Sequence, residues 1–152
     1  MGKPGNHVKT IVAAIASRED QERLRGILSF PEWEVQVVRD LRGLSTVVKT
    51  CSCCVVITET RLPDGRSWRE VLDELKGLRT RPQLIVADRL AEEVLWAEVL
   101  NRGAYDLLVT PFEPAEVQRV VLLAWDFSVR EAARARDSAM REAALRGFAV
   151  SA

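Results

Sequence analysis

The sequence predicts an α/β protein whose core is a doubly wound, five-stranded parallel sheet with helices on both faces. Five apolar runs rich in β-branched residues alternate along the chain with segments whose apolar residues recur at helical spacing. At 152 residues and 47% apolar composition, the chain is long enough for one buried core and too short for two domains of ordinary size. The last segment of helical spacing is unusually long, so an extended C-terminal helix completes the prediction.

The first half of the chain contains two strand-helix units and a third strand. Ser17 can cap a helix after the first strand, because Leu24, Ile27 and Leu28 fall on one helical face beyond it. The elements expected in this half are a strand at 8–16, the helix that Ser17 caps, a strand at 33–38, a helix at 41–50 and a strand at 53–58.

The second half continues the alternation. Trp68, Val71 and Leu75 are spaced for burial on a helix, Gly103 suits the left-handed residue just past a helix end, and Pro114 suits the first turn of a helix. The elements expected here are a helix beginning near Ser67, a strand at 84–87, a helix at 91–101, a strand at 106–109 and a helix at 114–146.

Three regions of different character follow from this reading. We expect a disordered leader at 1–7, a domain at 8–129 and an extension of the last helix at 130–152. The extension is rich in alanine, arginine and glutamate, which favour helix but bury little apolar area. It is either a solvated helix held by i,i+4 ion pairs or a surface for dimerisation or partner docking. The small residues that recur along it are Ala132, Ala135, Ala139 and Ala143.

The composition excludes several classes of protein. Twenty-two basic and twenty-two acidic residues cancel, so no nucleic-acid partner is expected. No apolar stretch is long enough for a membrane span and the start lacks an apolar signal region, so we expect a cytoplasmic protein without membrane contact. Cys51, Cys53 and Cys54 crowd into four residues, which favours reduced thiols, with Cys54 facing the core. A zinc site is not expected, because a second pair of ligands is missing.

Two segments carry a resemblance to a known family. One is the third strand with the loop after it, which reads Cys-Cys-Val-Val-Ile-Thr-Glu-Thr-Arg-Leu-Pro-Asp-Gly from Cys53 to Gly65. The other is Asn-Arg-Gly-Ala-Tyr-Asp-Leu-Leu-Val-Thr-Pro-Phe, from Asn101 to Phe112. In this order, over five strand-helix repeats, they resemble the response-regulator receiver (CheY-like) domain across residues 8–129. The resemblance implies the flavodoxin-like strand order 2-1-3-4-5, a role in two-component signal transduction or a phosphorelay, and a cis peptide bond before Pro111.

The residues that perform phosphoryl chemistry in that family are replaced in this chain. Aligned through the apolar face of the first helix, the acidic pair that binds Mg²⁺ falls on Ala16 and Ser17. The phosphoacceptor aspartate falls on Glu59, the hydroxyl residue of the fourth strand on Ala87, and the lysine before the cis proline on Thr110. Alanine and serine cannot replace carboxylates around a hard cation. We therefore expect no Mg²⁺, no other cofactor, no catalytic residues and a degenerate phosphoacceptor pocket.

Glu59 leaves three alternatives open. It is solvated or hydrogen-bonded to Thr110 or Ser17, or it acts as a built-in anion that resembles a phosphorylated state, or it accepts phosphate itself in a working phosphorelay. A shifted alignment would use Glu19 and Asp20 as the metal pair, but it would place both acids inside the first helix and move the apolar face out of phase.

The surface formed by the fourth helix, the fifth strand and the fifth helix is the expected contact face. The family's coupling of pocket to surface uses the fourth-strand hydroxyl and an aromatic residue in the fifth strand, and these positions are Ala87 and Leu107. The sequence therefore predicts a phosphorylation-independent interaction module that binds a protein partner or forms a homodimer. The candidate interface residues are Trp96, Leu107, Trp125, Val129, Ala132 and Ala139.

Overall fold

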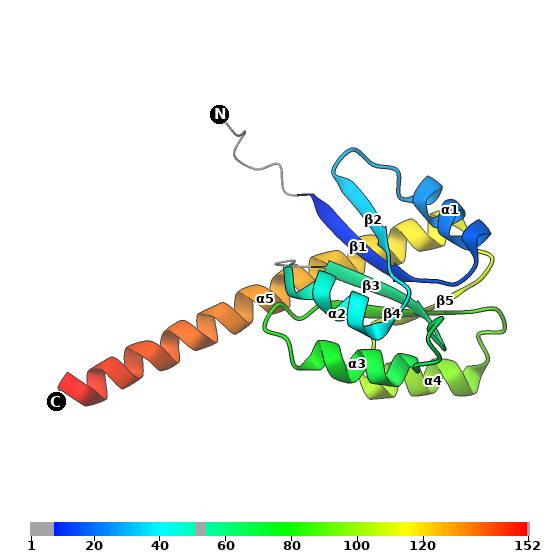
Figure 1. Ribbon diagram of the computed structural model, residues 1–152. Coiled ribbons are helices and arrows are strands. Elements are labelled where there is room, and N and C mark those ends of the chain that lie inside the picture. The colour runs from blue at the N-terminus through cyan, green and yellow to red at the C-terminus, as the bar shows by residue number, and fades with distance from the viewer. Residues whose placement is uncertain (1–7, 51–53, 152) are drawn as a thin grey trace.

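A computed structural model describes residues 8–50 and 54–151, with side chains as far as residue 147. The expected leader, Cys51 and Cys53 lie outside the described residues. Five parallel strands form one sheet in the order β2-β1-β3-β4-β5, which confirms the predicted topology (Figure 1). The strands are β1 (Lys9–Ala14), β2 (Trp33–Val37), β3 (Cys54–Glu59), β4 (Gln83–Asp88) and β5 (Asp106–Val109).

Helices cover both faces of the sheet. The helices are α1 (Arg18–Ile27), α2 (Leu41–Thr50), α3 (Trp68–Lys76), α4 (Glu93–Arg102) and α5 (Pro114–Ser151). On one face, α1 and the first part of α5 pack with Ile11, Ile57 and Ile85 into one core cluster. On the other face, α2, α3 and α4 pack with a second cluster that includes Val56 and the buried Cys54. The strands alternate between the clusters because successive side chains point to opposite faces.

Side-chain caps and a left-handed glycine form three of the predicted helix ends. The Ser17 hydroxyl accepts a hydrogen bond from the backbone N–H of Asp20 at 3.3 Å, which caps α1. Ser67 caps α3 in a reciprocal capping box with Glu70. Gly103 ends α4 at a φ of 97°, a left-handed conformation that glycine adopts without steric cost.

The fourth helix begins two residues later than the sequence predicts. The Asp88 carboxylate at the end of β4 accepts hydrogen bonds from the backbone N–H groups of Leu90 and Ala91. Ala91 itself has a positive φ of 45°, which is incompatible with a right-handed helix. The loop therefore extends to Glu92, and α4 starts at Glu93.

Helix α5 is 38 residues long and extends five residues beyond its predicted end. Its first part covers the sheet, and the remainder projects away from the domain (Figure 1). Ala132 is the last buried side chain of α5 among those described, three residues past the expected domain boundary at 129, and every side chain from 136 to 147 is exposed. Ion pairs such as Arg130 to Asp126 at 2.8 Å line the exposed part, as the solvated-helix alternative predicts.

Candidate functional site

The carboxyl edge of the sheet brings together the five residues of the predicted degenerate pocket. Ala16 and Ser17 follow β1, and Glu59 ends β3 directly beside Ala87 of β4 in the strand register. Thr110 follows β5, where its backbone N–H donates to the Asp88 carbonyl at 3.1 Å. The peptide bond between Thr110 and Pro111 is cis, as the resemblance implied. Residues from four strands therefore meet at the edge where doubly wound folds form their sites.

Glu59 is held by a backbone group. Its Oε1 accepts a hydrogen bond of 2.7 Å from the N–H of Ala16, across 43 residues of sequence. Among the described residues, the Glu59 carboxylate accepts from the β1–α1 backbone and not from Thr110 or Ser17, the partners expected from the sequence. The acid thus ties the end of β3 to the loop between β1 and α1.

A metal site is not assembled here. Among the described residues, no group of three or more histidine, cysteine, aspartate or glutamate side chains could hold a metal ion. Glu19 and Asp20 lie in the first turn of α1, where acids favour the helix dipole, and Leu24 and Ile27 face the core as the unshifted alignment requires. The shifted alignment with Glu19 and Asp20 as ligands is therefore wrong.

A second acid fixes the loop after β3. Asp64 accepts hydrogen bonds from the backbone N–H groups of Leu41, at the start of α2, and Arg66, both at 3.0 Å. Burial alone would raise the pKa of the Asp64 carboxyl, but the bonds from Arg66 and Leu41 outweigh it and lower the pKa. The Leu-Pro-Asp-Gly loop is thereby fastened to the neighbouring helix, so its aspartate has a structural role.

Three arginines that line one cavity were missed by sequence reasoning. A cavity of about 600 Å³ opens beside the β1–α1 loop, and its lining includes Arg18, Arg25 and Arg39. Each arginine is ordinary in its own sequence context. The only local signal is that Arg18 and Arg39 closely follow the ends of β1 and β2, where a parallel sheet places its loops on one edge.

The candidate interface residues divide into exposed and buried groups. Trp96 is 50% exposed on α4, and Val129 and Ala139 are exposed on α5. Trp125 is half-buried against Trp33, with ring centroids 5.7 Å apart. Leu107 and Ala132 are only 5% and 6% exposed, so these two candidates belong to the core and offer no surface to a partner.

Other apolar side chains enlarge the exposed face beyond the sequence prediction. Val94 on α4 is 82% exposed, and Val109 on β5 and Leu123 and Phe127 on α5 are also exposed. Helices α4 and α5 both contact β5, and the Phe127 ring lies 5.9 Å from Tyr105. The sequence could have indicated these residues, because α4 has more apolar residues than one helix face can bury.

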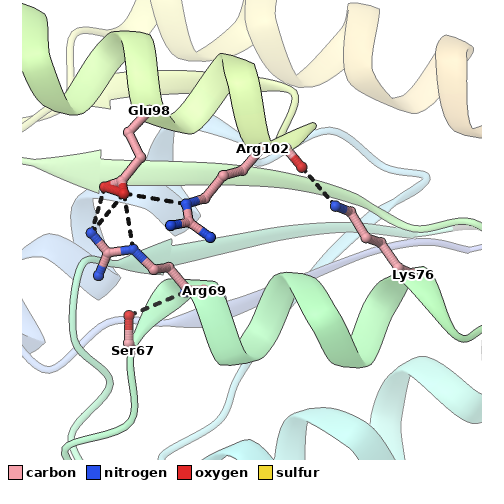
Figure 2. A network of polar contacts seen from close by, with 5 residues as sticks. All are labelled: Ser67, Arg69, Lys76, Glu98 and Arg102. Carbon is pink, nitrogen blue, oxygen red and sulfur yellow. Dashed lines mark hydrogen bonds and ion pairs between the residues drawn. The ribbon is translucent and has the colours of Figure 1, made fainter.

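One ion pair and one hydrogen bond join α4 to α3. The Glu98 carboxylate accepts hydrogen bonds from the guanidinium groups of Arg69 on α3 and Arg102 on α4, the latter at 3.2 Å (Figure 2). The Lys76 Nζ donates to the Arg102 carbonyl at 2.7 Å. The hydrogen bond from Arg69 is the main reason that the pKa of Glu98 is lowered. These contacts join the exposed helix to the rest of the domain.

Comparisons with known proteins identify the fold. No protein-family model matches the sequence, and no curated protein is similar to it. The beryllofluoride-activated NtrC4 receiver domain dimer aligns with a TM-score of 0.69 and 18% identity, over 78% of this chain and 98% of that chain. The signal receiver domain of a LuxO repressor protein from Vibrio parahaemolyticus aligns with a TM-score of 0.67 and 18% identity, over 88% of this chain and 97% of that chain. The chemotaxis response regulator CheY4 of Vibrio cholerae aligns with a TM-score of 0.63 and 18% identity, over 74% of this chain and 98% of that chain. The chain therefore has the fold of response-regulator receiver domains.

None of the helices in the described part of the chain has the length and apolar content needed to cross a bilayer.

Proposed function

We propose that this chain is a cytoplasmic signalling module with a receiver fold that works without phosphoryl transfer and without catalytic residues. It binds a second copy of itself or another protein through the surface of α4, β5 and α5. The observation that carries the first part of the proposal is the Glu59 carboxylate, whose Oε1 lies 2.7 Å from the Ala16 N–H at the place where a metal-binding acid is expected.

Phosphoryl transfer depends on positive charge placed against the oxygens of the transferred group. Ala16 and Ser17 provide no carboxylate for a metal ion, and Thr110 provides no ammonium group. Glu59 is a possible nucleophile by its chemistry, but among the described residues no group of three or more histidine, cysteine, aspartate or glutamate side chains could hold the metal ion that assists such a nucleophile. This composition of the edge supports a module that is not switched by phosphorylation.

The exposed apolar face supports the second part of the proposal. Val94 and Trp96 on α4 and Leu123 and Phe127 on α5 are exposed, and both helices contact β5; exposed apolar side chains that gather on one surface commonly mark protein contacts. The ion pair between Glu98 of α4 and Arg69 of α3 joins α4 to the domain, which supports a preorganised face for a partner. Such a face is accessible to a partner without phosphorylation of the chain.

Intact-mass measurement after incubation with acetyl phosphate and Mg²⁺ tests the absence of phosphorylation. We expect an unchanged mass for the unmodified chain and for the Glu59→Gln variant, which is the matched control. A stable addition of about 80 Da to the unmodified chain, absent in Glu59→Gln, would establish the alternative in which Glu59 is the phosphoacceptor.

Sedimentation of the full chain and of a Trp96→Glu variant tests the surface. We expect the variant to reduce the mass of the assembly, because a carboxylate within an apolar interface is costly to bury. Leu145→Glu is the control, since Leu145 is exposed on the projecting part of α5. A chain that ends after Ala135 keeps the buried Ser128 and Ala132 and measures the contribution of the projecting helix alone. If the unmodified chain is monomeric at all concentrations, self-association is excluded and only a different protein partner remains.

A further inference from the structure

The cavity beside the β1–α1 loop lies at the switch point of the sheet. Its lining combines residues that follow three different strands: Ile15 and Ala16 after β1, Arg39 after β2 and Pro63 after β3. In a sheet of order 2-1-3-4-5 the chain connections diverge at β1 and β3, which leaves a crevice between the loops at the carboxyl edge. Its volume of about 600 Å³ is in the range of small-molecule sites in proteins.

The cavity is positively charged. Arg18 and Arg25 lie on the same side of α1, and Arg39 follows β2. Glu22 is the one acidic residue of the lining, and it lies 3.9 Å from the Nε of Arg18. Within the described part of the chain, the side chains of Arg25 and Arg39 form no hydrogen bond or ion pair, so their guanidinium groups are available to a ligand.

The neighbouring acids are engaged with backbone groups. The Oε1 of Glu59 accepts from the Ala16 N–H, and the Oδ1 of Asp40 accepts from the Gly43 N–H at 2.6 Å. Gln21 donates from its Nε2 to the Ile15 carbonyl at 2.6 Å, which holds the loop that forms one wall. The wall is thus fixed by the protein itself, while three cationic side chains remain around the opening.

The geometry points to this cavity as a binding site for a small free molecule that carries phosphoryl groups. The planar guanidinium group presents paired N–H donors that match two oxygens of a phosphate, and arginine is the residue that most often supplies such contacts. Arg18, Arg25 and Arg39 would hold the anion directly, without a metal ion and without any covalent step. The site is separate from the proposed phosphorylation-independent contact face, so either can fail without the other.

Calorimetric titration of the full chain with inorganic pyrophosphate at constant ionic strength tests the site. We expect Arg39→Gln to weaken binding by about tenfold or more, because one charge-assisted pair is lost. Arg39→Lys should give an intermediate affinity, since it keeps the charge but loses the paired donors. Glu22→Gln should strengthen binding, because it removes the negative charge of the lining. Arg89→Gln is the matched control, since Arg89 is an exposed arginine after β4 that does not line the cavity.

Three results would overturn the inference. The first is no measurable binding of pyrophosphate to the unmodified chain. The second is equal weakening by Arg39→Gln and Arg89→Gln, which would indicate a general charge effect. The third is an affinity for pyrophosphate equal to that of the unmodified chain in a variant that combines Arg25→Gln and Arg39→Gln. Chemical-shift changes of the backbone amides of Ala16 and Arg39 on titration would place the bound anion in the cavity, and changes confined to other regions would count against it.

Discussion

The hydrogen bond between Glu59 and Ala16 can be tested by changing the length and charge of one side chain. Its 2.7 Å distance and ionised acceptor describe a strong bond, but Ala16 is exposed and Glu59 is only half-buried. Buried bonds to charged groups contribute about 1.5–3 kcal/mol, so we expect about 1 kcal/mol for this partly solvated one. For a chain of this size, that corresponds to a fall in melting temperature of about 2–4 °C.

The substitutions at Glu59 are expected to fall in a defined order. Glu59→Gln keeps an acceptor oxygen and loses only the charge, so it should lower the free energy of unfolding by about half as much as complete loss of the bond. Glu59→Asp withdraws the carboxylate by one methylene, about 1.5 Å, which places it beyond hydrogen-bond distance and should cost as much as Glu59→Ala. Restoring the residue that receiver domains carry is therefore expected to destabilise this chain.

Thermal unfolding and amide hydrogen exchange measure the two consequences of this bond. The melting temperature should be highest for the unmodified chain, lower for Glu59→Gln, and lowest for both Glu59→Asp and Glu59→Ala. The Ala16 amide should exchange faster in the last two variants. Glu32→Asp is a suitable control, because Glu32 is exposed outside the helices and its side chain forms no hydrogen bond or ion pair in the described part of the chain. Equal stability of the Asp variant and the unmodified chain, with unchanged exchange at Ala16, would refute the reasoning.

Three further substitutions test separate contacts. The Thr58 hydroxyl is fully buried and has no hydrogen-bond partner among the described residues, so Thr58→Val should raise the free energy of unfolding by about 1 kcal/mol in urea titration; a loss of stability would contradict this. The buried Ser128 hydroxyl donates to the Arg81 carbonyl at 3.1 Å, so Ser128→Ala should lower the free energy of unfolding by about 1 kcal/mol in the same assay, and no change would show the bond to be replaceable. Arg69 lowers the pKa of Glu98 in the folded chain, so its stabilising contribution is present above the unfolded pKa of about 4.3 and is lost as the pH falls through the folded value. The difference in melting temperature between the unmodified chain and Glu98→Gln should therefore favour the unmodified chain at pH 7 and shrink in acid; a difference independent of pH would exclude the ion pair as its cause.

Features encoded within a single element were predictable from the sequence. The apolar runs and helical spacing gave five strands and five helices, because the periodicity of 2 or 3.6 residues reports which face of an element is buried. Ser17, Ser67 and Gly103 marked helix ends through local backbone chemistry. That Ala16 and Ser17 carry no carboxylate was also readable, because it is a matter of residue type alone.

Features that join distant segments were decided by the tertiary structure. Glu59 binds a backbone N–H 43 residues away, which no side-chain pattern could indicate, since every residue other than proline carries that group. Leu107 and Ala132 looked available to a partner, yet the packing of the domain buries both. Arg18, Arg25 and Arg39 line one cavity because the loops after β1 and β2 share an edge of the sheet and α1 runs on from that edge. Local periodicity thus determined the elements, and the long-range packing of those elements determined which side chains meet.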